Sequence, residues 1–325
     1  RRFYNDLLAE RKTAWEERQE RIGKYEQLRQ VKERKATSPW AAEVHSHVLQ
    51  VVVTDLDKAF QAFFRRLKAG EKPGYPRFRG FHRFDSFGYK EYGNGFKVDG
   101  RRLRLSGIGR VAIRWHRPIV GAIKTVRLVK KASGWYACFS VEQEAAVLPP
   151  TGRDVGVDVG IASLIATSDG ETVPLQAWYR REQRRLRVAQ RRVARRLKGG
   201  KNRHKAVVQL RRRHERIANQ RKDFLNKLAH QLVAQYDRIA VEDLWIVNMV
   251  RNRHLAKSIL DAGWGYFVRR LHAKAAEAAR VVVEVDPAYT SKTCSGCGYV
   301  FETLTLKDRW IDCRCGLSLD RDHNA

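Results

Sequence analysis

Four of the five cysteines lie close together near the end of the chain, and they constrain the fold of that segment strongly. Cys294 and Cys297 form a CxxC pair, and a shorter CxC pair, Cys313 and Cys315, follows after fifteen residues. Two thiolate pairs at such spacing are typical of a ribbon in which four sulfurs bind one tetrahedral Zn²⁺. The alternative is two disulfides or free thiols. A closed four-thiolate site leaves no open position, so zinc here would be structural.

The fifth cysteine stands apart from this cluster. Cys138 lies in the alternating apolar stretch WYACFS. An isolated thiol in such a stretch predicts a buried structural cysteine.

The charge of the chain points to a polyanionic partner. Lys and Arg number 65 against 35 Asp and Glu, which gives a net charge of +30 and a pI near 10.4. Clustered cations bind the phosphates of nucleic acids through counterion release. An anionic membrane surface is the alternative, but it would favour one basic amphipathic helix, whereas this charge is spread over several segments. No apolar run reaches 18 residues, so no membrane span is expected.

Residues 1–70 have the pattern of a small helical unit. The first 35 residues are charged and helical in pattern, and Ser38 followed by Pro39 predicts the start of a second helix. Gly70 predicts its end. Apolar residues recur at steps of three or four along one face, namely Val44, Val48, Val52, Leu56, Phe60, Phe63 and Leu67.

Residues 71–150 differ from the preceding segment in composition and periodicity, and they predict a β-rich, barrel-like domain. Short alternating runs follow a stretch rich in Gly, Pro and aromatic residues, and 132–134 (ASG) predicts a hairpin turn. Five such runs separated by glycines favour a small barrel or a sandwich. The stretch VLPPTG at 147–152 predicts a linker.

Residues 151–325 predict an α/β domain. Two or three strands with a turn at Asp169-Gly170 come first, and two long helices split by KGGKN occupy 178–236. A short strand ending in acids, a helix over 262–279 and the strand RVVVEV follow. Alternation of helices with strands is typical of an α/β sheet.

The helical hairpin is strongly basic. Residues 180–222 contain 19 Lys or Arg against two acids, Glu182 and Glu215. A merely solvated helix pair would balance its charges along each face, so this excess predicts contact with a phosphate backbone. We expect contacts from Arg211, Arg212, Arg213, Arg216 and Arg221.

A second candidate surface for nucleic acid is the aromatic stretch 75–89. Its rings alternate with arginines, and such a pattern can stack bases while it binds phosphates. The rings can equally belong to a hydrophobic core. We expect contacts from Tyr75, Arg77 and Arg79.

Three acids stand where a metal-dependent nuclease would need them. Asp158 is expected in the middle of the strand VGVDVGIA, Glu242 stands at the acidic end of the strand RIAVEDL, and Asp320 and Asp322 follow the last cysteine pair. A carboxylate within an apolar strand is costly unless it has a partner or a metal. Each acid alone can also be explained as a turn or capping residue.

The chain resembles TnpB, the transposon-encoded, RNA-guided DNA nuclease family related to compact type V CRISPR effectors. The resemblance lies in six ordered motifs, GVDVGI, HERIANQRKDFLNKLA, AVEDL, DAGWGYF, VEVDPAYTSKTCSGCG and CGLSLDRDHNA. It implies a multidomain α+β fold. Its parts would be a helical recognition lobe at 1–70, a β-barrel-like wedge domain at 71–150, and an RNase H-like (RuvC) α/β nuclease domain at 151–325. The nuclease domain would include the basic hairpin 178–236 and a zinc ribbon at 289–318.

The resemblance also implies the site. Asp158, Glu242 and Asp322 match the three RuvC acids, which hold two Mg²⁺ or Mn²⁺ ions about 4 Å apart. Asp320 is the alternative to Asp322, because residues two apart lie about 200° apart around a helix and cannot face the same ions. Asp320 is then expected to cap the helix that bears Asp322.

The implied function is RNA-guided cleavage of DNA. The partners would be a guide RNA from the element's own end and double-stranded target DNA with an adjacent motif, in the cytoplasm of a prokaryote near its nucleoid. No membrane partner is expected. A cleavage-dead repressor on the same fold and an RNase H-like transposase are the alternatives. A repressor should lack one or more of the acids, and all three are present.

Overall fold

The computed structural model describes residues 1–81, 83–145, 147–304 and 308–324. The chain divides into two compact units, Arg1–Glu144 and Ala145–Ala325. His82 and Ala325, which belong to stretches singled out above, lie outside the described residues, as do 305–307 within the expected zinc ribbon. Within the described part of the chain, no helix is long and apolar enough to cross a membrane.

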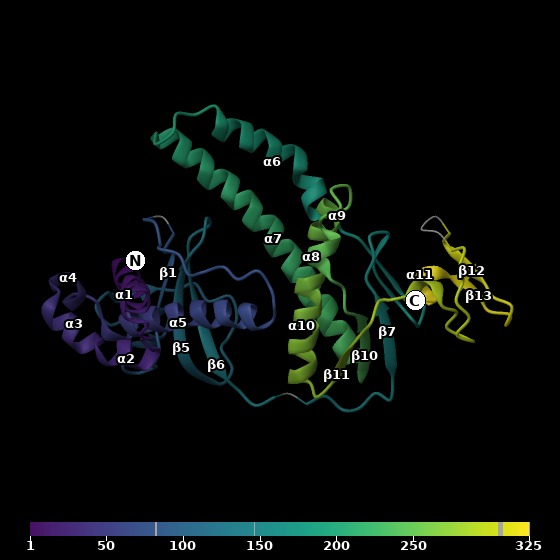
Figure 1. Cartoon of the computed structure of the whole chain (residues 1–325), viewed down its shortest axis with the longest axis horizontal. Helices are drawn as coiled ribbons and strands as arrows, with labels where there is room; N and C mark the ends of the chain where they lie inside the picture. The colour runs from purple at the N-terminus through teal and green to yellow at the C-terminus, as the bar shows by residue number, and fades with distance from the viewer. Residues whose placement is uncertain (82, 146, 305–307, 325) are drawn as a thin grey trace. The chain divides into compact units, whose positions relative to one another are not determined.

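The first unit begins with five helices. They are α1 (Arg2–Arg18), α2 (Lys24–Arg29), α3 (Val31–Thr37), α4 (Pro39–Ala42) and α5 (Ser46–Lys68) (Figure 1). The prediction that the long helix starts at Pro39 was wrong, because α4 stops after four residues and α5 starts anew behind His45. The ring of His45 accepts a hydrogen bond from the backbone N–H of His47 and so caps α5. Of the predicted apolar face, Val52, Leu56 and Phe60 are buried in the core that α5 shares with α1, and Leu49 and Val53 join them. Leu67, predicted for the same face, is exposed.

The rest of the first unit forms two antiparallel three-stranded sheets. One has the order β1-β5-β6 and the other β2-β3-β4. Their bounds are Ser86–Tyr89, Phe96–Asp99, Arg102–Leu105, Gly109–Ala112, Ala122–Lys130 and Trp135–Glu142 for β1 to β6. β1 was not predicted as a strand, since its residues belong to the aromatic stretch. The two sheets share one core, which includes Tyr89, Phe96 and Val126.

Cys138 corrects a prediction in this region. Its side chain is exposed, because it lies on the open face of β6. The residues that contribute to the core are its neighbours, Ala137 and Phe139. Alternation along a strand places Cys138 opposite them.

The second unit is built on a five-stranded sheet with the order β11-β10-β7-β8-β9. Its strands are β7 (Asp154–Asp158), β8 (Ser163–Thr167), β9 (Thr172–Pro174), β10 (Arg238–Glu242) and β11 (Val281–Val285). β10 pairs in parallel with both β7 and β11, whereas β8 and β9 are antiparallel. The predicted turn at Asp169-Gly170 joins β8 to β9, and Gly170 has the left-handed φ of 84° that it requires.

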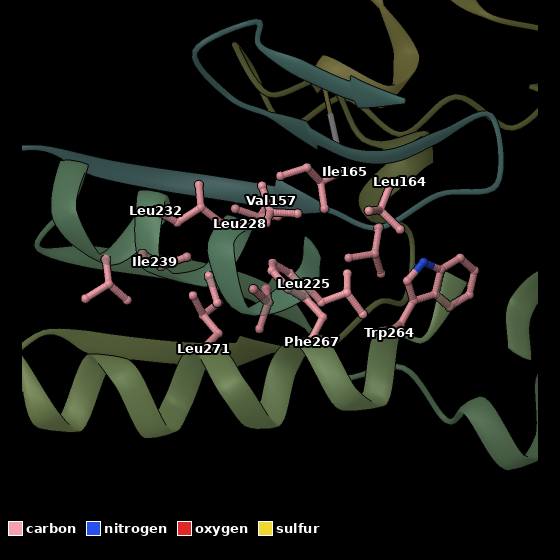
Figure 2. Close-up of a cluster of buried hydrophobic side chains, with 14 of the residues drawn as sticks. Val157, Leu164, Ile165, Leu225, Leu228, Leu232, Ile239, Trp264, Phe267 and Leu271 are labelled. Carbon is pink, nitrogen blue, oxygen red and sulfur yellow. The ribbon is translucent and has the colours of Figure 1, made fainter. Parts of the chain in front are cut away.

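The helices between β9 and β11 are α6 (Trp178–Ala194), α7 (Lys201–Gln235), α8 (Ile246–Met249), α9 (Ala256–Ala262) and α10 (Trp264–Glu277). The C-terminal half of α7, with α9 and α10, covers one face of the sheet, whereas α6 packs on α7. Figure 1 shows α6 and α7 side by side as the predicted hairpin. In Figure 2 apolar side chains from β7, α7 and α10, among them Val157, Leu228 and Phe267, meet in one layer. Packing in this core fixes the ends of β7 and β10, which bear the candidate acids Asp158 and Glu242.

The C-terminal segment is short of regular structure. It contains the 3₁₀ turn Thr290–Lys292, the paired strands β12 (Trp310–Asp312) and β13 (Ser318–Asp320), and the helix α11 (Arg321–Asn324). α11 lies close to β8 and to the 3₁₀ turn, so the end of the chain returns to the sheet.

Candidate active site and cysteine cluster

Two of the candidate acids end neighbouring parallel strands. Asp158 is the last residue of β7 and Glu242 the last residue of β10, and the residues just before them, Val157 and Val241, pair across the two strands. The carboxyl ends of parallel strands lie at the same edge, so the two acids are neighbours there. Because Val157 and Val241 face the core, alternation directs both acids to the opposite face. Asp158 therefore ends its strand. The prediction that it lies in the middle of a strand was wrong.

The third candidate acid comes to this edge from α11. Asp320 accepts a hydrogen bond from the backbone N–H of Asp322 at 2.8 Å and so caps the helix. Asp322 lies in its first turn, where the Arg309 guanidinium is 3.6 Å from its Oδ1. Asp320 is thus used locally, which leaves Asp322 as the carboxylate that α11 presents to the sheet edge.

The electrostatics of Asp158 show that the three acids lie close together. Burial raises its pKa first, and the negative charges of Glu242 and Asp322 raise it further, to about 6. A hydrogen bond from the Val159 backbone and the charge of Arg321 oppose this shift. Partly buried, mutually repelling carboxylates are costly by themselves, and a bound cation offsets that cost.

Thr290 was not found by sequence reasoning. Its hydroxyl donates a hydrogen bond to Oε1 of Glu242 at 2.5 Å. A second contact joins its Oγ1 to the carbonyl of Pro287 at 3.2 Å. Such a bond fixes the rotamer of a carboxylate ligand. A single Thr does not indicate this role in the sequence. The signal that could have found Thr290 is its position four residues before Cys294, where the cysteine segment leaves the sheet.

The donor set of this edge fits hard divalent cations. Three carboxylates from β7, β10 and α11 supply oxygen atoms, which are the ligands that such cations prefer. The charges of Glu242 and Asp322 both raise the pKa of Asp158, so negative charge is concentrated at this edge.

The four clustered cysteines converge on one point. Sγ of Cys294 is 3.7 Å from that of Cys315, Sγ of Cys297 is 3.5 Å from that of Cys313, and all four sulfurs lie within 4.8 Å of one another. Four sulfurs around a tetrahedral Zn²⁺ would be separated by about 3.8 Å, given Zn–S bonds of about 2.3 Å. The cluster therefore has the size and the donor atoms of a zinc site.

Two glycines make the knuckles possible. Gly298 and Gly316 have left-handed φ values of 75° and 89°, and their N–H groups donate to the carbonyls of Cys294 and Cys313 at 2.9 Å each. Most other residues are strained at such φ values. Each pair of thiols is thus held by a tight turn of the backbone.

The arginines of the basic hairpin fall into two groups. Arg211, Arg212, Arg213 and Arg216 are exposed along α7. Arg221 differs, because its Nη2 lies 2.7 Å from Oδ1 of Asp261, a carboxylate that is only 2% exposed. This pairing gives Arg221 a structural role, and its expected contact with nucleic acid stays a prediction.

Asp261 fixes the base of the hairpin. Its carboxylate also accepts hydrogen bonds from the backbone N–H groups of Tyr179 and Arg180 at the start of α6. It thereby caps α6 while it neutralises Arg221. Sequence reasoning noted the DAGWGYF motif without assigning this acid a role.

The aromatic stretch also divides in two. Tyr75, Phe78 and Phe81 are exposed, whereas Tyr89 is in the core. Arg77 is exposed. Arg79 lies over the ring of Tyr4 at 5.3 Å. The first half of the stretch is thus mostly exposed, while Tyr75 also packs edge-on against Phe60.

Comparisons with known proteins agree with this architecture. A family model described as a probable transposase (OrfB of IS605) matches residues 137–253, and one described as a Cas12f1-like TNB domain matches residues 264–325. The solved structure of a Cas12f1–guide RNA–target DNA complex has a TM-score of 0.61 and 14% identity, and the match covers 99% of this chain and 78% of that one. This likeness concerns the fold.

Curated relatives match over most of the chain. A protein of Streptomyces pristinaespiralis, named as an RNA-guided DNA endonuclease, is 35% identical over 100% of this chain and 81% of its own length. InsQ of Escherichia coli, named likewise, is 30% identical over 85% of this chain and 71% of its own length. The Cas12f1 endodeoxyribonuclease of Sulfoacidibacillus thermotolerans is 26% identical over 59% of this chain and 48% of its own length.

The mixed sheet, the helices on one face and the ribbon-like cysteine segment define an RNase H-like, RuvC-type nuclease fold. Within this class, the chain belongs to the TnpB family of RNA-guided DNA endonucleases.

Proposed function

We propose that the protein is the RNA-guided DNA endonuclease of a transposable element. It pairs a guide RNA, transcribed from the end of its own element, with double-stranded DNA that bears an adjacent motif. It then hydrolyses phosphodiester bonds of the matched DNA. The observation that supports this most strongly is the geometry of the sheet edge, where Asp158 and Glu242 end neighbouring parallel strands and α11, which bears Asp322, lies close to β8.

In this proposal Asp158, Glu242 and Asp322 hold two divalent cations, Mg²⁺ or Mn²⁺. When bound, such ions activate a water and stabilise the leaving oxygen of the phosphodiester. Thr290 orients Glu242 through its hydroxyl, and Asp320 holds the first turn of the helix that bears Asp322. Cys294, Cys297, Cys313 and Cys315 hold a structural Zn²⁺.

The exposed cations bind the nucleic acids. Arg211, Arg212, Arg213 and Arg216 contact phosphates along α7. Tyr75, Arg77 and Arg79 form a second, smaller surface in the first unit. We retain the division into a recognition lobe at 1–70, a wedge domain at 71–150 and a nuclease domain at 151–325 as part of the proposal.

The deciding experiment uses the protein purified with co-expressed guide RNA. Double-stranded DNA with a matching target is offered in the presence of Mg²⁺, and cutting should require both guide and metal. Asp158→Ala should abolish the cutting and leave guide-dependent binding intact. Binding without cutting by the intact protein would instead support a repressor, and joining of DNA ends without a guide would support a transposase.

A further inference from the structure

We propose that Asn324 is a positioning residue that joins the helix of Asp322 to the first cysteine knuckle. Zinc at the cysteines then sets how tightly the carboxylate site binds its divalent cations. This inference rests on the proposed function, because it takes Asp158, Glu242 and Asp322 as the metal ligands.

The side-chain amide of Asn324 is buried and bonded at both of its ends. It is the last residue of α11 and is 4% exposed. Its Nδ2 donates to the carbonyl of Thr293 at 2.6 Å, and its Oδ1 accepts from the N–H of Ser295 at 2.9 Å. These two backbone groups stand on either side of Cys294. A donor and an acceptor on one planar amide fix both the distance and the orientation of that segment.

The same segment also supports Glu242. Thr290, whose hydroxyl binds Glu242, lies in the 3₁₀ turn that leads to Cys294. Thr293 Oγ1 donates to the carbonyl of Tyr289 at 2.9 Å, which ties this turn to the start of the knuckle. Residues 290–295 thus contact Glu242 directly and the helix of Asp322 through Asn324.

α11 depends on such contacts for its position. The described helix has four residues, and a helix this short does not form by itself in water. Its entry is fixed by the Asp320 cap and by the bond from Arg321 N to the carbonyl of Arg309 at 2.8 Å. The bonds of Asn324 fix its other end. Asp322 lies between these two points, so loss of either loosens its carboxylate.

The cysteine knuckle in turn depends on its metal. Without it, four thiols in two short turns gain conformational freedom, and the backbone at Thr293 and Ser295 is no longer held in place. Loss of an outer-shell partner of a metal ligand commonly weakens metal binding by roughly 10- to 100-fold. We expect a loss in this range at the carboxylate site when Asn324 or the zinc is removed.

The test measures metal binding directly. The full chain, freed of nucleic acid, is titrated with Mn²⁺, and the bound Mn²⁺ is measured by electron paramagnetic resonance. The Asp158→Ala variant measures how much Mn²⁺ binds at sites other than the three carboxylates. Asn324→Ala should weaken the Asp158-dependent sites by roughly 10- to 100-fold while zinc content stays unchanged. His323→Ala is the matched control, because it shortens the neighbouring side chain of the same helix and leaves both bonds of Asn324 in place.

Four further variants test the connection from the zinc site to the carboxylates. Cys297→Ser should lose zinc and weaken Mn²⁺ binding, and adding Asn324→Ala to it should cause little further loss, because both changes act on one connection. Thr290→Val, which removes only the hydroxyl, should weaken Mn²⁺ binding with zinc retained. Asn324→Asp, which keeps the size and the acceptor, replaces Asn324→Ala should that variant not fold, and should weaken Mn²⁺ binding in the same direction.

Mn²⁺ binding of wild-type strength in a zinc-free Cys297→Ser chain, or in a folded Asn324 variant, would overturn the inference. Failure of the proposed function has a different signature. A wild-type chain that binds Mn²⁺ at the Asp158-dependent sites but never cuts guide-matched DNA would contradict the nuclease and leave the coupling intact.

Discussion

Glu242 lies beside Asp158 at the end of the adjacent parallel strand, and its negative charge helps to raise the pKa of Asp158. Burial is the larger cause, and Asp322 on α11 adds to it. The fold therefore places two acids, Glu242 and Asp322, where each makes ionisation of Asp158 less favourable. Such a site is costly when empty of cations and is stabilised when it binds them.

The first prediction concerns pH. The pKa of Asp158 is about 6 in the folded chain against an ordinary value of 3.8, so the folded state holds this proton more tightly than the unfolded state. The resulting stability is present in full below about pH 4 and is lost as the pH rises through 6. A shift of this size corresponds to about 3 kcal/mol.

Asp158→Asn should therefore raise the melting temperature of the protein in EDTA at pH 7.5, and have about half that effect at pH 5. Thermal unfolding at both pH values checks this. Added Mg²⁺ should stabilise the wild type more than the variant. Equal melting temperatures of the wild type and Asp158→Asn at pH 7.5 would show that burial and the neighbouring carboxylates do not make ionised Asp158 costly.

The second prediction concerns zinc content. Cys297→Ser should lose the bound zinc, because three thiolates cannot close the tetrahedral site. Cys138→Ser should keep it, since Cys138 is exposed and lies outside the cluster. Elemental analysis after gel filtration measures zinc per chain. A zinc content that fell in both variants would contradict the assignment of the four ligands.

The third prediction concerns the ion pair at the base of the hairpin. Asp261→Ala should lower the free energy of unfolding by about 3–5 kcal/mol, because it leaves Arg221 partly buried without a partner. It also removes the acceptor for the N–H groups of Tyr179 and Arg180. Urea unfolding checks this.

Asp223→Ala is the matched control for that experiment. Asp223 pairs with Lys227 at 2.8 Å on the same helix, but both side chains are mostly exposed. An exposed pair contributes about 0.3–0.5 kcal/mol. Similar decreases in the free energy of unfolding of the two variants would show that the Asp261–Arg221 pair contributes no more than an exposed ion pair.

The fourth prediction concerns the salt dependence of nucleic-acid binding. Replacing Arg211, Arg212 and Arg213 with Ala should make the slope of log K against log salt shallower, by about 0.7–0.9 for each phosphate that the protein no longer neutralises. The same three residues changed to Lys should keep most of the slope, because the slope depends on charge. Binding isotherms at several salt concentrations measure it. An unchanged slope in the Ala variant would show that the hairpin is a solvated helix pair that does not contact phosphates.

Much of the architecture was predictable because it follows from local patterns. The long helix α5, the hairpin of α6 and α7, the turn at Gly170 and the strand that bears Glu242 are each specified by neighbouring residues. The start of α5 was predicted wrongly, because Ser38 and Pro39 do form a helix start, but of a separate four-residue helix. Cys138 was placed in the core because an alternating strand does not show from its sequence which face is covered.

The sequence by itself determined the composition of the candidate sites: two cysteine pairs at ribbon spacing, acids after apolar strands and a hairpin with excess positive charge. These are properties of spacing and residue type. Only the tertiary structure decided which side chains meet. Asp261 pairs with Arg221 across 40 positions and Thr290 binds Glu242 across 48. Such contacts depend on how strands and helices pack, and local periodicity contains no information about them.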